Sequence, residues 1–255
     1  MKIICTIFLI LFLGGCGTEF KEIEKRIENS SDAADVRISF FQLKRDAYYI
    51  YQWNKNETFR NEINEFKRLD KKNFPEKDKI LFTGSSSIRF WDSLEKDMEP
   101  LKVLNRGFGG AQISHVIHHF EEIVKPYNPK AIVFFCGTND LTALKTPEEA
   151  FNDFKKFLNL VRYEFGNIKV YFIGIKPSVD RFYLDKEEKI FNSSIKALAS
   201  QDAYLEYINV WDSMLNQDGS RKPELYIDDG LHMNKKGYEI WTKLIRDSLG
   251  EDFDL

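Results

Sequence analysis

The feature that most constrains this chain is an alternation of short apolar runs with helical patterns that begins near Lys79. The helical patterns lie between the runs or after the last one. Short, continuous apolar runs indicate strands buried on both faces, and strands separated by helices form parallel sheets. The sequence therefore predicts an α/β fold with a five-stranded parallel sheet, its strands at residues 80–82, 101–104, 131–135, 169–175 and 204–210.

Two of the helices between or after these strands have recognisable starts. Thr146 suits an N-cap, Pro147 suits the first helical position, and Glu149 completes a capping box. This helix is expected to run to about residue 165. Asn234 is expected to cap the final helix, close to the C-terminus.

The N-terminus has the pattern of a bacterial lipoprotein signal. A lysine at position 2 precedes an apolar run, residues 3–13, that is too short to span a bilayer as a helix. The sequence Leu13-Gly14-Gly15-Cys16 then predicts cleavage before Cys16 and acylation of that cysteine. The expected location is the bacterial cell envelope, lipid-anchored to a membrane and facing away from the cytoplasm. An ordinary secretory peptide followed by an incidental cysteine is the alternative.

These patterns divide the chain into three predicted segments. Residues 1–15 are the signal peptide, residues 16–78 are an N-terminal tether and helical arm, and residues 79–255 are the α/β domain. Within the arm, apolar residues recur three or four positions apart, as on one face of a helix; they are Phe59, Ile63, Phe66 and Leu69.

Composition and cysteine content exclude several classes of protein. The net charge of −3 and the absence of a basic patch argue against a nucleic-acid partner. Once Cys5 has left with the signal and Cys16 is lipidated, only Cys136 remains, so no internal disulfide can form. A small buried residue is the expected role of Cys136. The sequence does not specify the oligomeric state.

Three separated segments carry polar groups at strand ends or in the loops before helices. They are Gly84-Ser85-Ser86-Ser87, Gly137-Thr138-Asn139-Asp140 and Asp229-Gly230-Leu231-His232. In an open α/β sheet, ligands bind at the carboxyl ends of the strands. A serine, a histidine with an aspartate three residues earlier and an asparagine amide are the groups that acyl transfer requires.

The first two motifs resemble those of the SGNH, or GDSL, hydrolase superfamily. The family's Gly-Asp-Ser places the nucleophile at Ser86, although Ser85 stands where the family has aspartate. The adjacent serines Ser85 and Ser87 therefore remain alternatives. The family's Asn-x-Gly-x-x-Gly matches the segment from Asn105 to Gly110, and the resemblance assigns the Gly110 backbone N–H to the oxyanion hole.

The other two motifs match in the same order along the chain. Gly-x-Asn-Asp assigns the Asn139 side-chain amide to the oxyanion hole, together with the backbone N–H of Ser86. Asp-x-x-His assigns Asp229 as the group that orients the base and His232 as the base itself. Asp140 is expected to shape its loop.

The resemblance implies a flavodoxin-like three-layer α/β/α sandwich, the SGNH hydrolase fold. It also implies a serine esterase or acylhydrolase that cleaves carboxylic esters with no cofactor and no metal. A membrane-anchored lysophospholipase or lipase and a carbohydrate acetylesterase are the alternatives within this class. A non-catalytic surface-binding lipoprotein and a nucleotide- or phosphate-binding flavodoxin-like protein are the alternatives outside it.

Two further patterns compete with this interpretation. A dinucleotide fingerprint starting at Gly107 would need glycine at position 112, which is Gln112. His115 and His119 share a helix face and could bind zinc, but the segment lacks the H-E-x-x-H motif. Solvent-exposed histidines are the favoured interpretation of that segment.

Overall fold

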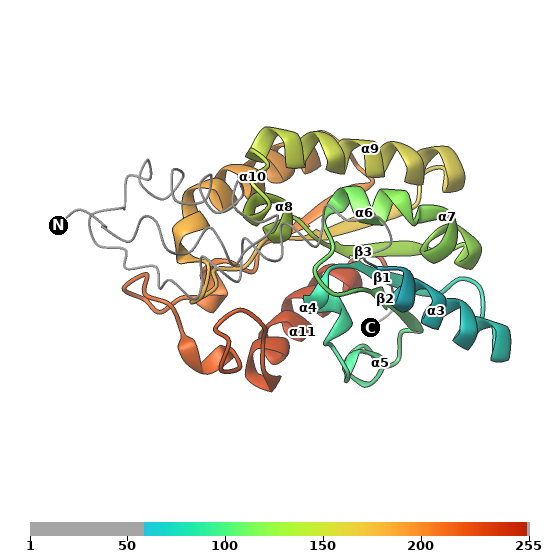
Figure 1. The fold of residues 1–255 in the computed structure, drawn as a ribbon, viewed down its shortest axis with the longest axis horizontal. Helices are drawn as coiled ribbons and strands as arrows, with labels where there is room; N and C mark the ends of the chain where they lie inside the picture. Colours follow the sequence, from blue (N-terminus) through green and yellow to red (C-terminus); the bar gives the residue numbers. More distant parts are fainter. Residues whose placement is uncertain (1–58, 254–255) are drawn as a thin grey trace, which may run out of the picture. The chain divides into compact units, whose positions relative to one another are not determined.

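A computed structural model of the chain describes residues 59–253, and within them a single sheet has five parallel strands (Figure 1). The strands are β1 (Ile80–Gly84), β2 (Val103–Gly107), β3 (Ala131–Phe135), β4 (Lys169–Ile173) and β5 (Leu205–Ile208). Their order in the sheet is β2-β1-β3-β4-β5. The predicted fold class and strand number are confirmed, and the order is that of the flavodoxin-like doubly wound sheet.

Helices cover both faces of this sheet, which gives three layers. Helices α6, α9 and α10 pack together on one face, and α4, α5 and α11 lie on the other (Figure 1). The helices are α3 (Arg60–Lys72), α4 (Ser86–Arg89), α5 (Leu94–Asp97), α6 (Ile113–His118), α7 (Phe120–Ile123), α8 (Thr138–Thr142), α9 (Pro147–Phe165), α10 (Asp185–Ala199) and α11 (Lys235–Gly250). No helix among residues 59–253 is long and apolar enough to cross a membrane.

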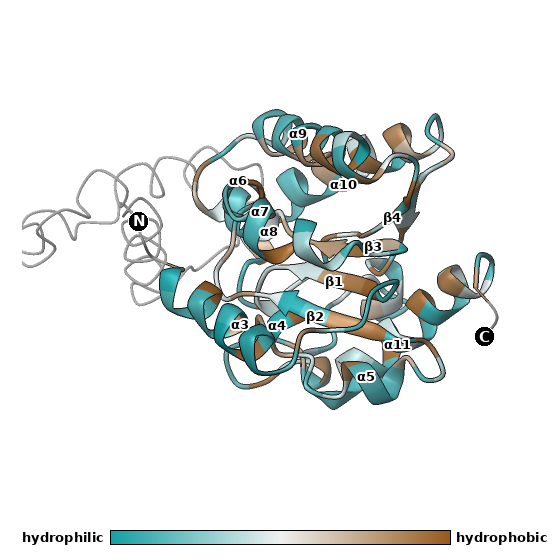
Figure 2. Ribbon diagram, turned by 90° about the vertical axis from the view of Figure 1, so that its right-hand side faces the viewer, coloured by the Kyte–Doolittle hydropathy of each residue, from teal (hydrophilic) through white to brown (hydrophobic). Residues whose placement is uncertain are grey.

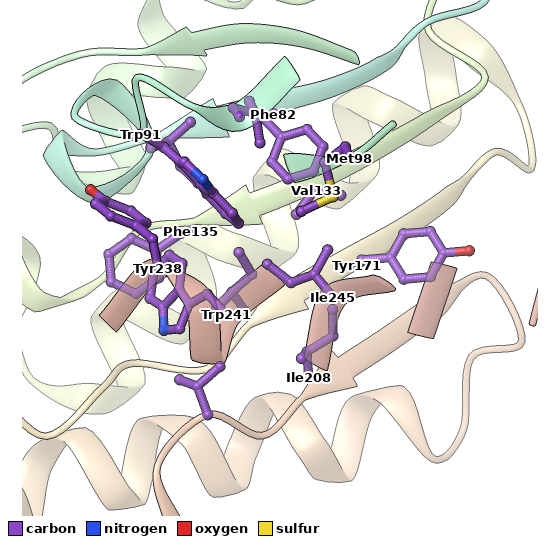
Figure 3. Close-up of a cluster of buried hydrophobic side chains, with 14 of the residues drawn as sticks. Phe82, Trp91, Met98, Val133, Phe135, Tyr171, Ile208, Tyr238, Trp241 and Ile245 are labelled. Atoms are coloured by element: carbon purple, nitrogen blue, oxygen red, sulfur yellow. The ribbon is translucent and has the colours of Figure 1, made fainter. Parts of the chain in front are cut away.

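Aromatic side chains fill the space between the sheet and both helical layers. Successive strand residues point to opposite faces, so Phe135 packs on Trp241 of α11 whereas Phe134 stacks on Phe157 of α9. Figure 3 shows the first of these two cores, in which Trp91 also lies against Tyr238. Figure 2 shows the complementary pattern, with hydrophilic residues along α3 and α9 and hydrophobic residues in β1 and β3.

The two predicted helix starts are confirmed. The Thr146 hydroxyl accepts a hydrogen bond from the Glu149 amide, and the Glu149 carboxylate accepts one from the Thr146 amide. The Asn234 side chain accepts from the amides of Lys236 and Gly237 at the start of α11. These caps satisfy N–H groups that the first helical turn leaves without partners.

Strand β2 differs from its prediction, because it starts later and continues through the polar residues Asn105 and Arg106. Both side chains have partners that satisfy their polar groups inside the protein. The Asn105 amide donates to the Ile88 carbonyl, and its oxygen accepts from the Gly107 amide. The Arg106 guanidinium pairs with Asp70. Sequence polarity alone gives no sign of these long-range partners.

Helix α3 packs against the α/β domain through polar contacts as well as through its apolar face. Asp70 forms the ion pair with Arg106, and Glu62 accepts a hydrogen bond from the Gly109 amide. Ile63 is fully buried as expected, but Leu69 is exposed. The predicted signal peptide and the greater part of the predicted arm lie outside the described residues.

The turn after β1 depends on a glycine, and this generates a stability prediction. Gly84 has φ +129°, and a Cβ there would lie 2.0 Å from the Phe135 carbonyl oxygen. We expect Gly84→Ala to lower the free energy of unfolding by more than about 3 kcal/mol, among the largest single-site losses. Chemical unfolding of the full-length chain measures this loss.

Gly166→Ala is the matched control, because Gly166 has φ +68° but open space where the Cβ would go. It should cost only the backbone strain, about 1–3 kcal/mol. Equal losses in the two variants would contradict the close approach of β1 to β3 as the cause.

Candidate active site

The predicted site residues converge at the carboxyl edge of the sheet, where β1 and β3 lie side by side. The chain leaves β1 towards β2 and leaves β3 towards β4, so the two following loops run in opposite directions. Such a switch point opens a crevice in doubly wound sheets. Ser86 follows β1 and Asn139 follows β3, which places both residues at this point.

The serine turn separates the three adjacent serines by environment. Ser85 is buried, and its amide donates to the Phe135 carbonyl at 2.9 Å. Ser87 is buried too, and its carbonyl accepts from the Tyr238 hydroxyl. Ser86 is only partly buried, and its Oγ lies 2.9 Å from His232 Nε2. Ser86 is therefore the serine of this turn whose hydroxyl is hydrogen-bonded to His232.

His232 also contacts Asp229, so the three side chains form one hydrogen-bonded chain. His232 Nδ1 lies 2.5 Å from Asp229 Oδ2. The other carboxylate oxygen accepts from the backbone amides of Leu231 at 2.9 Å and His232 at 2.8 Å. Since a carboxylate only accepts, a neutral His232 carries its proton on Nδ1 and leaves Nε2 to accept from the Ser86 hydroxyl.

The three N–H groups predicted to bind an oxyanion come from three segments. Asn139 lies in α8 and is nearly buried, with Nδ2 donating to the Ala111 carbonyl at 2.9 Å. Gly110 has φ +73°, a conformation that favours glycine. Within residues 59–253, the backbone amides of Ser86 and Gly110 have no acceptor. These donors are available to a ligand.

Asp140 shapes the neighbouring loop, as expected from the sequence. Its fully buried carboxylate accepts from the Ile113 amide at the start of α6 and pairs with Lys145 at 2.8 Å. Burial raises the pKa of Asp140 to about 6, against the opposing effect of Lys145. Asp140 thereby links the loop after β3 to the segment that follows Gly110.

Two buried cations, Lys176 and Arg181, affect the pKa of His232. Burial lowers the pKa of His232, and the positive charges of Lys176 and Arg181 lower it further, while Asp229 opposes them. Lys176 is itself buried, which lowers its pKa to about 8. Burial raises the pKa of Glu188, which faces both cations, to about 8.

Sequence reasoning missed several residues around the site. Lys176, Arg181 and Glu188 lie in the loop after β4 and in α10, and Phe90 lies edge-on to the His232 ring with centroids 4.8 Å apart. The run Lys-Pro-Ser-Val-Asp-Arg directly after a predicted strand was a usable signal, because charged residues at a carboxyl strand end point to a site. Glu188 gave no signal, since it lies in a helix rich in charged residues.

The histidines around α6 have structural partners, and one of them is not exposed as expected. His119 is buried and lies 2.7 Å from Glu122 Oε2, and His115 Nδ1 accepts from the Gln112 amide. Among residues 59–253, no group of three or more His, Cys, Asp or Glu side chains is arranged to hold a metal ion. Cys136 is buried, as expected. Cys16 lies outside the described residues.

A doubly wound parallel sheet with a serine hydroxyl hydrogen-bonded to a histidine at its carboxyl edge is typical of ester hydrolases. Comparison with known proteins agrees with this class: the chain belongs to the GDSL-like lipase/acylhydrolase family, whose model matches residues 82–240. The protein accordingly has the SGNH hydrolase fold, within a family of lipases and acylhydrolases.

Individual relatives are distant. N-acylneuraminate cytidylyltransferase from Escherichia coli is 24% identical over 164 residues, which cover 63% of this chain but only 38% of that protein. A GDSL-like lipase structure from Bacteroides thetaiotaomicron matches with a TM-score of 0.61 and 21% identity, covering 80% of this chain and all of that one. A carbohydrate esterase family 3 structure from Talaromyces cellulolyticus matches with a TM-score of 0.54 and 17% identity, covering 68% and 97%.

The environment of His232 predicts a pH profile. A histidine acts as a base only when neutral, so activity should rise with pH through the pKa of His232. Because burial and the two cations lower that pKa from 6.5, the midpoint of kcat/KM should fall below 6.5. The sequence alone predicts only the ordinary range of roughly 6–7.5.

Replacing Asp229 should lower the catalytic rate. Asp229→Asn keeps the shape but favours the wrong tautomer, and we expect a kcat loss of about 10⁴-fold. Asp228→Asn is the matched control, because this adjacent carboxylate is exposed and should leave turnover intact. Turnover like that of the wild type in Asp229→Asn would remove Asp229 from the mechanism.

Proposed function

We propose that this protein is a serine esterase that cleaves carboxylic esters through Ser86, His232 and Asp229. The observation that carries the proposal is the hydrogen-bonded chain from Ser86 Oγ through the His232 ring to Asp229. A serine hydroxyl is a weak nucleophile until a neighbouring base takes its proton. The 2.9 Å contact to His232 Nε2 supplies that base.

In the proposed mechanism, Ser86 Oγ attacks the ester carbonyl while His232 takes its proton. The negative charge that develops on the carbonyl oxygen is bound by the backbone amides of Ser86 and Gly110 and by Asn139 Nδ2. Asp229 stabilises the imidazolium as it forms. His232 then protonates the leaving alcohol, and water, activated by the same histidine, hydrolyses the acyl-enzyme and frees Ser86.

Screening of ester substrates identifies the natural acyl group and alcohol. The structural neighbours include an acetyl xylan esterase, a carbohydrate esterase and a lipase/acylhydrolase from Enterococcus faecalis. A panel of acetylated glycans, lysophospholipids and esters of increasing chain length would distinguish a carbohydrate acetylesterase from a lysophospholipase or lipase. A non-catalytic binding protein would turn over none of them.

The choice of nucleophile is tested by a pair of adjacent substitutions. Ser86→Ala should lower kcat on p-nitrophenyl acetate by at least about 10⁴-fold, because the nucleophile and its base act as a unit. Ser85→Ala should keep most of its turnover, since the hydrogen bond to His232 Nε2 comes from Ser86. An inactive Ser85→Ala beside an active Ser86→Ala would move the nucleophile by one residue.

We further propose that the enzyme is lipid-anchored through Cys16 at the bacterial cell envelope and faces away from the cytoplasm. The support is the sequence pattern of residues 1–16, a positive start, a short apolar run and Gly-Gly-Cys. Acylation of Cys16 would hold the protein at a membrane that its ester substrates could share.

Cys16→Ser should move the protein from the membrane to the soluble fraction while hydrolysis of a small soluble ester survives. Survival is expected because Cys16 precedes the strand before Ser86 by a long stretch of chain. Fractionation of both forms, expressed in a bacterium that processes lipoproteins, measures this. A wild-type protein that is wholly soluble would defeat the anchoring proposal without affecting the esterase.

A further inference from the structure

The Asn139 side-chain amide is held at both of its ends. Arg181 Nη1 donates to Asn139 Oδ1 at 3.0 Å, and Asn139 Nδ2 donates to the Ala111 carbonyl at 2.9 Å. A guanidinium can only donate and a carbonyl can only accept. If the amide were flipped, its NH₂ group would face the Arg181 guanidinium and its oxygen would face the Ala111 carbonyl, and neither pair could form a hydrogen bond. The two contacts together therefore fix the orientation of the Asn139 amide. Nδ2 keeps its second N–H for a ligand.

Arg181 is an unusual residue to find in this position. Its side chain is 3% exposed, and its Nε has no hydrogen-bond partner in the structure. Leaving a buried donor unpaired costs about 1–3 kcal/mol, so stability alone does not account for this arginine.

The backbone around Arg181 is fixed by the same loop that carries the histidine. The Arg181 amide donates to the Ser178 hydroxyl at 3.2 Å, and the neighbouring Asp180 amide donates to the Gly230 carbonyl at 3.0 Å. Gly230 lies between Asp229 and His232 in sequence. The loop after β4 thus contacts the histidine loop through its backbone and Asn139 through the Arg181 side chain.

We propose that Arg181 is a positioning residue that locks Asn139 in its oxyanion-binding orientation and strengthens its N–H as a donor. Hydrogen bonds to charged groups are stronger than neutral ones, and a donor on the amide oxygen polarises the amide so that its N–H donates better. The inference rests on the proposed function, because it requires Asn139 to bind the oxyanion. Arg181 itself acts through Asn139 and does not touch the substrate.

A double-mutant cycle on the full-length chain tests this, with p-nitrophenyl acetate as substrate. Asn139→Ala should lower kcat by roughly 10²–10³-fold with little change in KM, as loss of one oxyanion donor does. Arg181→Met removes the charge and the hydrogen bond, and should lower kcat by about 10-fold or more without exceeding the loss in Asn139→Ala. In the Asn139→Ala background, Arg181→Met should cost less than about threefold further, because the amide it acts on is gone.

Two additional variants separate positioning from a structural role. Arg181→Lys should restore part of kcat, because the Asn139 contact uses a single guanidinium nitrogen that an ammonium can replace. It also provides the test if Arg181→Met does not fold, as judged by thermal unfolding. Arg162→Met is the control, since Arg162 pairs with Asp202 and with carbonyls before β4 and β5, at the opposite edge of the sheet. Its kcat should match the wild type.

The outcomes are distinguishable. Losses that multiply in the double variant, or an Arg181→Met enzyme with unchanged kcat, would overturn the positioning role and leave the esterase mechanism standing. If Arg181→Met does not fold, an Arg181→Lys loss that multiplies with Asn139→Ala would overturn it equally. An Asn139→Ala enzyme with unchanged kcat would overturn both the oxyanion assignment and the role of Arg181. An active Ser86→Ala would overturn the proposed function itself.

Discussion

The close approach of β1 and β3 is the constraint on which the site depends. The two strands pair in parallel along their whole length, and Gly84 lets β1 end directly against the Phe135 carbonyl, which then accepts the Ser85 amide. Because the chain turns away in opposite directions after the two strands, the Ser86 turn and the Asn139 turn lie at the switch point of the sheet, where doubly wound folds bind ligands. A side chain at position 84 would push these turns apart, and the distance between a nucleophile and an oxyanion donor tolerates little change.

Much of this arrangement could be predicted from the sequence, for local physical reasons. Apolar runs marked the strands, and Thr146 and Asn234 marked helix starts. The resemblance to the SGNH hydrolase motifs, rather than local physics, assigned Ser86, Asn139 and His232 to one site. What the sequence did not predict was non-local. Asn105 and Arg106 read as a loop because their burial depends on Ile88 and Asp70, which are far away in the sequence.

The same limit explains why the support of the site was missed. The motifs name the groups that would face a substrate. Arg181 instead contacts Asn139 and, with Lys176, lowers the pKa of His232, and Glu188 interacts with both cations. These residues affect the site through their contacts with other side chains and through their burial. Neither property is visible in the spacing of residues along the chain. His119 shows the converse, since a histidine expected in solvent is buried against Glu122.

The position of His232 just before the final helix has a consequence for synthesis of the protein. The Ser86–His232 hydrogen bond joins residues 146 apart, and Tyr238 of α11 ties the same helix to the Ser87 carbonyl. A ribosome releases the N-terminal parts of a domain first, so the serine turn emerges long before its base. Under the proposed mechanism the nascent chain therefore stays inert until α11 has docked. The first appearance of esterase activity during synthesis would then report that α11 has docked.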